Sequence, residues 1–305
     1  MEITVNAGSA AFFEALGSET RLKIVALLAE QPMDIGEMAE SLGVSSAIVT
    51  RHIDTLQKAG IVTAEKTAGR RGRRRLCRLR EDTALLRFRP AAGEEGVMRA
   101  SVPVGHYSAW QVRPTCGLAR PEGIIGAVDD PRYFADPAHV GASLLWFGGG
   151  YVEYRLPNFL LRGQSARAIQ LSFEICSEAP GVNENWPSDI AFSLNGVRLG
   201  TWTSPGDFGG RRGRLTPLWW DGTQYGLLKT LRVDASGSYI DGIRLSDVTI
   251  ARLGLDFGRE IVFRVANPPE AAHRGGVTLF GRGFGNYDQN IELRLFADPP
   301  ASVQL

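Results

Sequence analysis

A run of small, polar and cationic residues at 45–60 lies between two helix-boundary signals and could contact nucleic acid. Ser45 can accept hydrogen bonds from the first free amides of a helix, and Gly60 can adopt the left-handed conformation that ends one. Apolar residues recur at helical spacing on one face, at Val49, Ile53 and Leu56. The opposite face carries Ser46, Ala47, Thr50, Arg51 and Asp54. Short side chains allow close approach to a major groove, although an ordinary surface helix has the same periodicity.

An arginine cluster follows this helix in the sequence. Two short β-patterned runs, 61–65 and 74–79, flank a turn with Gly69 and Gly72 and predict a β-hairpin, the wing. Its cationic residues are Arg70, Arg71, Arg73, Arg74, Arg75, Arg78 and Arg80. A solvated charge run is the usual interpretation of such a cluster. Its position beside the helix favours contact with phosphates or the minor groove instead.

The preceding segments predict the rest of a helix-turn-helix. Helical patterns cover 9–16 and 18–31, and a third covers 35–42. Asp34 and Glu37 have the spacing of a capping box at the start of the third helix. A helix, a tight turn and a capped helix in this order, followed by a β-hairpin, are typical of a winged helix-turn-helix.

Residues 9–80 resemble the winged-helix domain of the arsenic-repressor (ArsR) family. The resemblance is carried by FFEALGSETRLKIVALLAE and IGEMAESLGVSSAIVTRHIDTLQKAGIV. It implies a homodimer on a double-stranded DNA operator, and we expect a repressor. The candidate DNA-binding residues are Ser45, Ser46, Ala47, Thr50, Arg51 and His52 of the helix, with Arg70, Arg71, Arg73, Arg74 and Arg75 of the wing. His52 is expected to pack and hydrogen-bond rather than to catalyse.

The chain departs from the metal-sensing members of that family. These place two cysteines, one residue apart, where this chain has Asp34, Ile35 and Gly36. Soft-metal sensing needs thiolate ligands, so we expect no metal site and no cofactor. Segment 81–88 is the only candidate for the family's last dimer helix, which leaves the dimer surface open.

Cysteine usage and hydropathy narrow the class of protein further. Cys77, Cys116 and Cys176 are widely separated, which argues against a disulfide framework and a zinc knuckle. The N-terminus lacks a signal-peptide pattern, and no apolar run is long enough to cross a bilayer. We therefore expect a cytoplasmic protein with no membrane partner.

Beyond residue 101 the sequence predicts β-structure. Pro90 to Ser101 mixes Pro, Gly and charge and is the predicted linker between domains 1–89 and 102–305. The expected strands are 151–156, 168–176, 190–194, 197–203, 227–233, 248–253, 260–265, 277–280 and 291–296. The pair Asn195-Gly196 is a strong hairpin signal. The predicted fold class is α+β overall, an N-terminal winged helix-turn-helix followed by a mainly antiparallel β-sandwich or jelly roll.

Polar-aromatic clusters in the second domain suggest a ligand site. Segment 189–208 is similar to the sugar-binding jelly rolls of glycosidases, and the whole chain resembles ArsR-like regulators of carbohydrate utilisation with a C-terminal sandwich, through GDFGGRRG, LWW, QYGLLKT and FGRGFGNYDQ. A sugar needs an aromatic face and planar hydrogen-bonding groups. The candidate effector-binding residues are Trp186, Asp189, Asp207, Arg211, Arg212, Trp219, Trp220, Tyr225, Arg282, Asn286, Tyr287 and Asp288.

Three functions remain open at this point. The first is a non-enzymatic regulator, without catalytic residues, whose sandwich binds a small polar effector such as a sugar. The second is a DNA-binding domain fused to a glycoside-processing enzyme, which needs two carboxylates facing one cleft. Its candidates are Glu174, Glu184, Asp189 and Asp207. The third is a sandwich that serves only dimerisation or protein docking, which a loop end without a pocket would favour.

Overall fold

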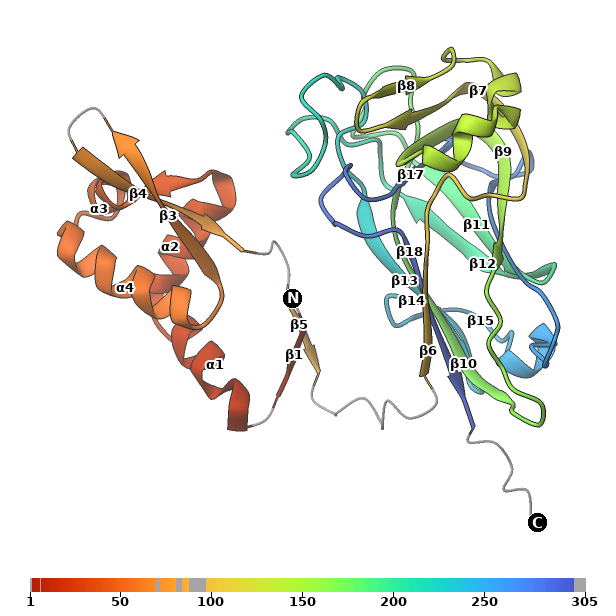
Figure 1. Ribbon diagram of the computed structural model, residues 1–305, viewed down its shortest axis with the longest axis horizontal. Coiled ribbons are helices and arrows are strands. Elements are labelled where there is room, and N and C mark those ends of the chain that lie inside the picture. Colours follow the sequence, from red (N-terminus) through yellow and green to blue (C-terminus); the bar gives the residue numbers. More distant parts are fainter. Residues whose placement is uncertain (1, 6, 70–71, 81–83, 88–96, 299–305) are drawn as a thin grey trace. The chain divides into compact units, whose positions relative to one another are not determined.

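The computed structural model describes residues 2–5, 7–69, 72–80, 84–87 and 97–298. The chain divides into two compact units, Met1–Glu94 and Glu95–Leu305 (Figure 1). Within the described ranges, no helix is long and apolar enough to cross a membrane.

The first unit has the predicted winged helix-turn-helix. Its elements are η1 (Ala7–Ser9), α1 (Ala10–Leu16), α2 (Glu19–Glu30), β2 (Met33–Asp34), α3 (Ile35–Leu42), α4 (Ser46–Lys58), β3 (Val62–Gly69) and β4 (Gly72–Leu79). The strands form a sheet of order β2-β4-β3, and β3 and β4 are the two strands of the wing. The predicted wing strands are confirmed, and each is longer than expected.

Local signals fix the helix that precedes α4. The Asp34 carboxylate accepts from the amides of Gly36 and Glu37, and the Glu37 carboxylate accepts from the Asp34 amide at 2.7 Å. The predicted capping box is therefore confirmed. At the other end Gly43 takes φ 66°, the left-handed conformation that lets the chain turn directly into α4.

Segment 81–88 contains a strand where the family resemblance offered a dimer helix. β5 (Leu85–Arg87) pairs in parallel with β1 (Glu2–Thr4). The remainder of the segment, 81–83 and 88, lies outside the described residues.

The second unit is a large antiparallel β-sandwich, as predicted. Its strands are β6 (Val97–Val102), β7 (Ala109–Arg120), β8 (Gly123–Ile125), β9 (Leu144–Leu156), β10 (Ala166–Cys176), β11 (Ser188–Leu194), β12 (Val197–Ser204), β13 (Leu227–Asp234), β14 (Gly237–Ile240), β15 (Ile243–Ser246), β16 (Ile261–Asn267), β17 (Val277–Phe280) and β18 (Ile291–Ala297). The main path runs β12-β11-β16-β9-β17-β10-β13-β14-β15, while β18 joins β10 to β6 and β7 joins β9 to β8.

Two segments of this unit have a different secondary structure from the one predicted. The second half of the predicted linker forms β6, which pairs with β18, because an alternating run at 97–102 can bury one face against the sheet. The strand expected at 248–253 is instead a short 3-10 helix, η4 (Ile250–Leu253), and Gly254 ends it in the left-handed conformation. Its apolar residues pack into the core from a helical turn. A short apolar run can therefore be buried from a helical turn as well as from a strand, and this run was wrongly predicted as a strand. Several further segments were not predicted: the strands β7, β8, β14 and β15, and the 3-10 helices η2 (Pro131–Ala135) and η3 (Pro137–Gly141).

The start of β9 is buried on both faces of the sheet. Leu145 and Phe147 point into the main core, and Leu144 and Trp146 belong to a second apolar cluster on the other face. A sheet face that would otherwise meet water is thus covered locally. The cover includes Trp220, in the long loop 205–226 between β12 and β13.

Candidate DNA interface and ligand pocket

Helix α4 presents the predicted polar face to solvent. Ser46, Ala47 and Arg51 are exposed, whereas Val49, Ile53 and Leu56 are buried in the core of the first unit. The Ser45 hydroxyl caps the helix by accepting from the Ile48 amide. Thr50 is half-buried, and its hydroxyl donates to the Ser46 carbonyl at 2.8 Å. The surface has the short, exposed side chains that a groove-binding helix requires.

The side chain of Arg75 is held against α4. Its guanidinium donates to Asp54 at 2.7 Å and to Gln57 at 2.5 Å. Its charge is therefore already paired within the fold, and the side chain joins the wing to α4. Arg70 and Arg71 lie outside the described residues, as do the side chains of Arg73 and Arg74.

His52 is half-buried on α4. Desolvation lowers its pKa, and the charges of Arg21 and Arg51 lower it further. Both effects favour the neutral imidazole. Arg21 also donates to the carbonyls of Ala15 and Glu14, and so caps the end of α1.

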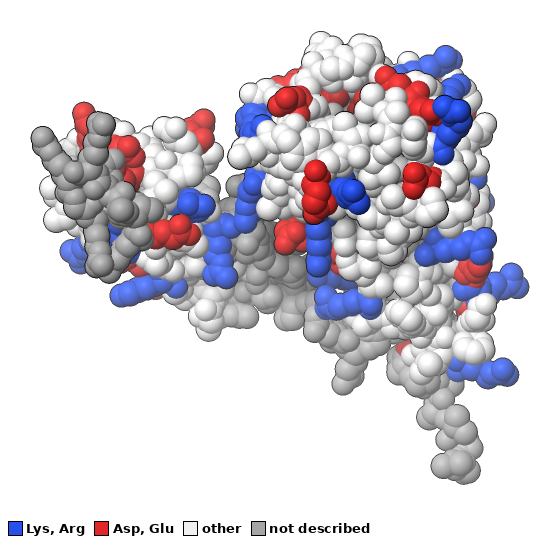
Figure 2. Space-filling view, turned by 45° about the horizontal axis from the view of Figure 1, so that its top comes forward, with Lys and Arg blue, Asp and Glu red and all other residues white. Residues whose placement is uncertain are grey.

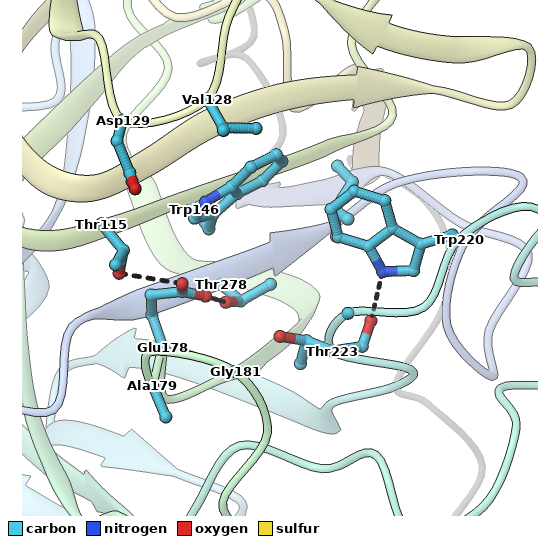
Figure 3. Close-up of a pocket in the computed structure, with 12 residues that line it drawn as sticks. Thr115, Val128, Asp129, Trp146, Glu178, Ala179, Gly181, Trp220, Thr223 and Thr278 are labelled. Carbon is cyan, nitrogen blue, oxygen red and sulfur yellow. Dashed lines mark hydrogen bonds between the residues drawn. The ribbon is translucent and has the colours of Figure 1, made fainter.

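The second unit has a small pocket on the covered face of β9 (Figure 3). Its cavity volume is about 180 Å³. The lining residues are Thr115, Val128, Asp129, Leu144, Trp146, Glu178, Ala179, Gly181, Trp220, Gly222, Thr223 and Thr278. Trp146 and Trp220 form aromatic walls, with ring centroids 5.2 Å apart and planes tilted by 57°. The cavity is smaller than a drug-sized site, so it has room only for a small ligand.

The Trp146 wall depends on a close backbone approach. Gly117 of β7 pairs across the sheet with Trp146, and a Cβ at Gly117 would lie 2.2 Å from the indole. The Trp146 ring therefore lies flat on the glycine. On the opposite wall, the Trp220 indole donates to the Thr223 carbonyl at 2.9 Å, which fixes the orientation of that ring.

Glu178 is buried, with 8% of the residue exposed, and its carboxyl group lies between two threonines (Figure 3). Its two oxygens accept from the hydroxyls of Thr115 at 3.0 Å and Thr278 at 2.9 Å. Thr115 reaches it because a bulge interrupts the pairing of β7 with β9 between Arg113 and Cys116. Desolvation and the negative charges of Asp207 and Asp129 raise the pKa of Glu178 to about 8, against the opposing effect of the hydrogen bonds.

Asp207 lies directly behind the Glu178 segment and is fully buried. Its Oδ2 accepts from the Ala179 amide at 2.9 Å, while Oδ1 has no hydrogen-bond partner among the described residues. Desolvation raises the pKa of Asp207 to about 6, although the Ala179 amide and the Thr223 side chain lower it. Two carboxyl groups with raised pKa values therefore share this corner of the sandwich.

A third buried carboxylate, Glu174, anchors the loops around the pocket. It accepts from the amides of Gly226, Asn286 and Tyr287 at 2.8–3.0 Å. Gly285 has φ 74°, and a Cβ there would lie 2.4 Å from the Glu174 oxygens. The glycine-rich segment 281–287 thus wraps a buried carboxylate.

Most of the predicted effector residues have partners in the fold. Trp220 lines the pocket and Asp207 lies behind it, but the other ten do not line it. Arg211 lies over Tyr225, 4.5 Å from the ring centroid, and Tyr225 stacks on Phe208. Arg212 donates to the carbonyls of residues 217 and 218.

The remaining predicted residues are distributed around the sandwich. The Trp186 indole donates to the Glu178 carbonyl, and the Trp219 indole donates to the Pro121 carbonyl. Asp189 accepts from Thr203 and His273. The Asn286 side chain accepts from the Arg214 amide, the Tyr287 amide donates to Glu174, the Arg282 amide donates to Asn290, and Asp288 is exposed.

Sequence reasoning missed the main pocket residues, Thr115, Asp129, Trp146, Glu178 and Thr278. One signal was available for Trp146: the uninterrupted apolar run 144–147 is typical of a strand buried on both faces. The structure places the three cysteines in buried positions without disulfides, and desolvation together with nearby carboxylates raises the pKa of Cys116 to about 11. Among the described residues, no three His, Cys, Asp or Glu side chains gather as metal ligands would.

The charged side chains of the protein do not form a uniformly basic surface (Figure 2). On the visible face of the larger unit, acidic and basic side chains are interspersed among uncharged ones (Figure 2). The chain carries a formal net charge of +1. Any strong attraction to DNA phosphates must therefore come from a local surface rather than from overall charge.

The family described as bacterial regulatory protein, arsR family, matches residues 18–64. A search of curated proteins finds no match. Among solved structures, HlyU from Vibrio vulnificus is 27% identical over 24% of this chain and 72% of that one, with TM-score 0.21. The homodimeric winged helix-turn-helix DNA-binding domain of Mb0332 from Mycobacterium bovis is 24% identical over 23% of this chain and 61% of that one, with TM-score 0.21.

The second unit is similar to a solved structure of another kind. This structure is the CBM36-1 domain of a multidomain xylanase from the hindgut metagenome of Trinervitermes trinervoides. The match covers 67% of this chain and 98% of that domain. The identity is 8% and the TM-score 0.28.

The family match at residues 18–64 covers the span from the start of α2 to β3, and the capping box and the exposed polar face of α4 lie within it. Residues 18–64 of the first unit therefore match a helix-turn-helix of the arsR type, which is a DNA-binding fold.

Proposed function

We propose that the protein is a sequence-specific, cytoplasmic transcriptional repressor that acts as a homodimer and is controlled by a sugar bound in its β-sandwich. The observation that carries the proposal is the pocket between Trp146 and Trp220, in the same chain as an arsR-type recognition helix. Indole faces suit the C–H surfaces of a sugar ring, and the threonine hydroxyls and Glu178 suit its hydroxyl groups.

Control of DNA binding requires that the sugar distinguish two states of the dimer. A ligand that binds one arrangement of the two recognition helices more tightly shifts the population toward that arrangement. Two half-sites on one face of DNA lie about 34 Å apart, so only arrangements with that spacing bind an operator well. As a repressor released by its effector, the protein binds the sugar more tightly when it is free of DNA.

The pocket also bears on the alternative functions. A sandwich used only for docking needs no aromatic-walled cavity with hydroxyl groups and a buried carboxyl group. For glycoside hydrolysis, Glu174 is fully buried and bound by three backbone amides, so it is not free to act on a substrate. We therefore favour a binding site over a catalytic one.

The test begins with selection of bound sequences from random duplex DNA by the full-length protein. We expect a palindromic operator with half-sites about 10 base pairs apart. Fluorescence anisotropy of the labelled operator is then measured against a panel of mono- and disaccharides. At least one sugar should weaken operator binding about tenfold.

The matched variants are Trp220→Ala in the pocket and Trp202→Ala on β12, outside the pocket lining. Trp220→Ala should bind the operator normally without sugar and lose the response, whereas Trp202→Ala should keep it. No enriched sequence would contradict the DNA-binding proposal. An operator whose binding no sugar alters, or an unchanged response in Trp220→Ala, would contradict the effector proposal.

A further inference from the structure

The charge of the pocket indicates which kind of sugar it suits. Only two of the lining residues are ionisable, Asp129 and Glu178, and both are acids. A third acid, Asp207, lies behind the wall with one carboxyl oxygen unpartnered. None of the described residues that line the cavity is a lysine or an arginine. The pocket therefore disfavours anions, whereas its acidic groups would attract a cation.

The aromatic walls favour positive charge in the same place. The faces of Trp146 and Trp220 carry the negative side of the indole quadrupole, and tryptophan is the best side chain for cation–π contact. The Glu178 carboxyl group, held by Thr115 and Thr278, lines the same pocket as Trp146 (Figure 3). An ammonium group in this pocket would thus have aromatic faces and a carboxylate within reach.

The hydrogen bonds leave Glu178 able to accept from a ligand. A carboxylate has about four acceptor positions, and the two threonine hydroxyls occupy one on each oxygen. Asp129 uses one oxygen to accept from the Cys116 amide at 2.9 Å. Both acids therefore retain acceptor capacity toward the cavity, and a protonated amine has three donors to satisfy.

We infer that the effector is an amino sugar or a similar hydroxylated organic cation, whose ammonium group binds Glu178 and Asp129 between Trp146 and Trp220. The inference rests on the proposed effector site and names its ligand class. Binding of a cation stabilises the ionised form of Glu178, so a proton leaves that carboxyl group as the ligand enters.

The test measures binding directly on the full-length protein, without DNA, by isothermal titration calorimetry at pH 6.5. The probes are glucosamine, which carries an ammonium group at this pH, and its neutral analogues N-acetylglucosamine and glucose. We expect glucosamine to bind at least tenfold more tightly than either neutral sugar. Titrations in two buffers of different ionisation enthalpy should show net proton release with glucosamine alone.

Two pocket variants and one control locate the effect. Glu178→Gln should remove most of the tenfold preference and the proton release. Asp129→Asn should reduce the preference; Asp129 has φ 61°, a conformation that asparagine tolerates, so this variant should fold even if the other does not. Glu184→Gln, an exposed carboxylate outside the pocket lining, should change neither quantity.

The outcomes separate this inference from the proposed function. Equal or tighter binding of a neutral sugar, or no binding of any of the three probes, would overturn the charged-ligand inference. If the charged-ligand inference fails but some other sugar changes operator binding, the proposed function still stands. A glucosamine preference that survives both Glu178→Gln and Asp129→Asn would also overturn the inference, because the charge would be recognised elsewhere.

Discussion

Replacement of the buried carboxyl group in the pocket should change how the stability of the sandwich depends on pH. In the folded protein the pKa of Glu178 is raised from its ordinary value of 4.5 to about 8, mainly because burial penalises the charged form. Between these two pH values the folded chain holds a proton that the unfolded chain has released. The free energy of unfolding must therefore fall as the pH rises from about 4.5 to about 8, and level off above that.

The magnitude follows from the same difference. The full pKa difference corresponds to on the order of 5 kcal/mol, and the part between pH 5.5 and pH 8.5 to about 3 kcal/mol. A domain is stable by about 5–15 kcal/mol, so such a change is measurable. Glu178→Gln removes the titrating group and keeps an oxygen acceptor. Relative to the variant, the wild type should lose about 3 kcal/mol across this range.

Tryptophan fluorescence during urea unfolding measures this effect in the full-length chain. All six tryptophans lie in the second unit, so the signal follows the sandwich and not the helix-turn-helix. Linear extrapolation at each pH gives the free energy of unfolding. The raised pKa of Asp207, about 6, contributes in the same direction in both proteins and largely cancels in the comparison.

Glu184→Gln is the matched control, since it removes an exposed carboxylate from the adjacent loop. Its difference from the wild type should change little with pH. If the free energies of wild type and Glu178→Gln run parallel from pH 5.5 to pH 8.5, within about 0.5 kcal/mol, the folded Glu178 titrates like a solvent-exposed acid. The description of the pocket as a desolvated acidic site would then be wrong.

Four further substitutions test other parts of the structure. Arg51→Ala should weaken operator binding about tenfold and relax base preference, as measured by anisotropy on operator variants. Asp34→Ala should destabilise the first unit by about 1 kcal/mol, measured by far-ultraviolet circular dichroism on unfolding, because it removes the cap of α3. Gly117→Ala should displace the Trp146 ring, cost about 1–3 kcal/mol and shift the tryptophan emission. Glu174→Ala should cost several kcal/mol in urea unfolding, because three buried or partly buried backbone amides lose their acceptor.

The sequence allowed the helix-turn-helix to be predicted because its signals are local. The Asp34–Glu37 capping box, Gly43 and the apolar stripe of α4 each involve residues within one or two helical turns of one another. Local hydrogen bonding and periodicity decide such elements before tertiary contacts form. Sandwich strands such as β16 and β18 were found for the same reason, since their alternation of buried and half-buried residues is regular.

The pocket could not be predicted in this way because its residues are distant in the sequence. Thr115, Trp146 and Thr278 come from three neighbouring strands, while Glu178 follows a fourth and Trp220 lies in a long loop. Only the sheet order β7-β9-β17-β10 brings them together. Which strands become neighbours depends on tertiary packing, and the spacing of single residues in the sequence carries no information about it.

Most of the polar and aromatic residues that cluster in the sequence lie outside the pocket lining, and there is a physical reason for this. The loop 205–226 contains no strand or helix, yet it covers a sheet face and includes buried polar groups at Thr216 and Gln224. Every buried amide and carbonyl in such a loop needs a partner. The Thr216 hydroxyl donates to the Gln224 carbonyl, and the Gln224 side chain donates to carbonyls at 220 and 222. Arginine, glutamine and threonine therefore accumulate there to hold the loop, and the loop in turn holds Trp220 in the pocket wall.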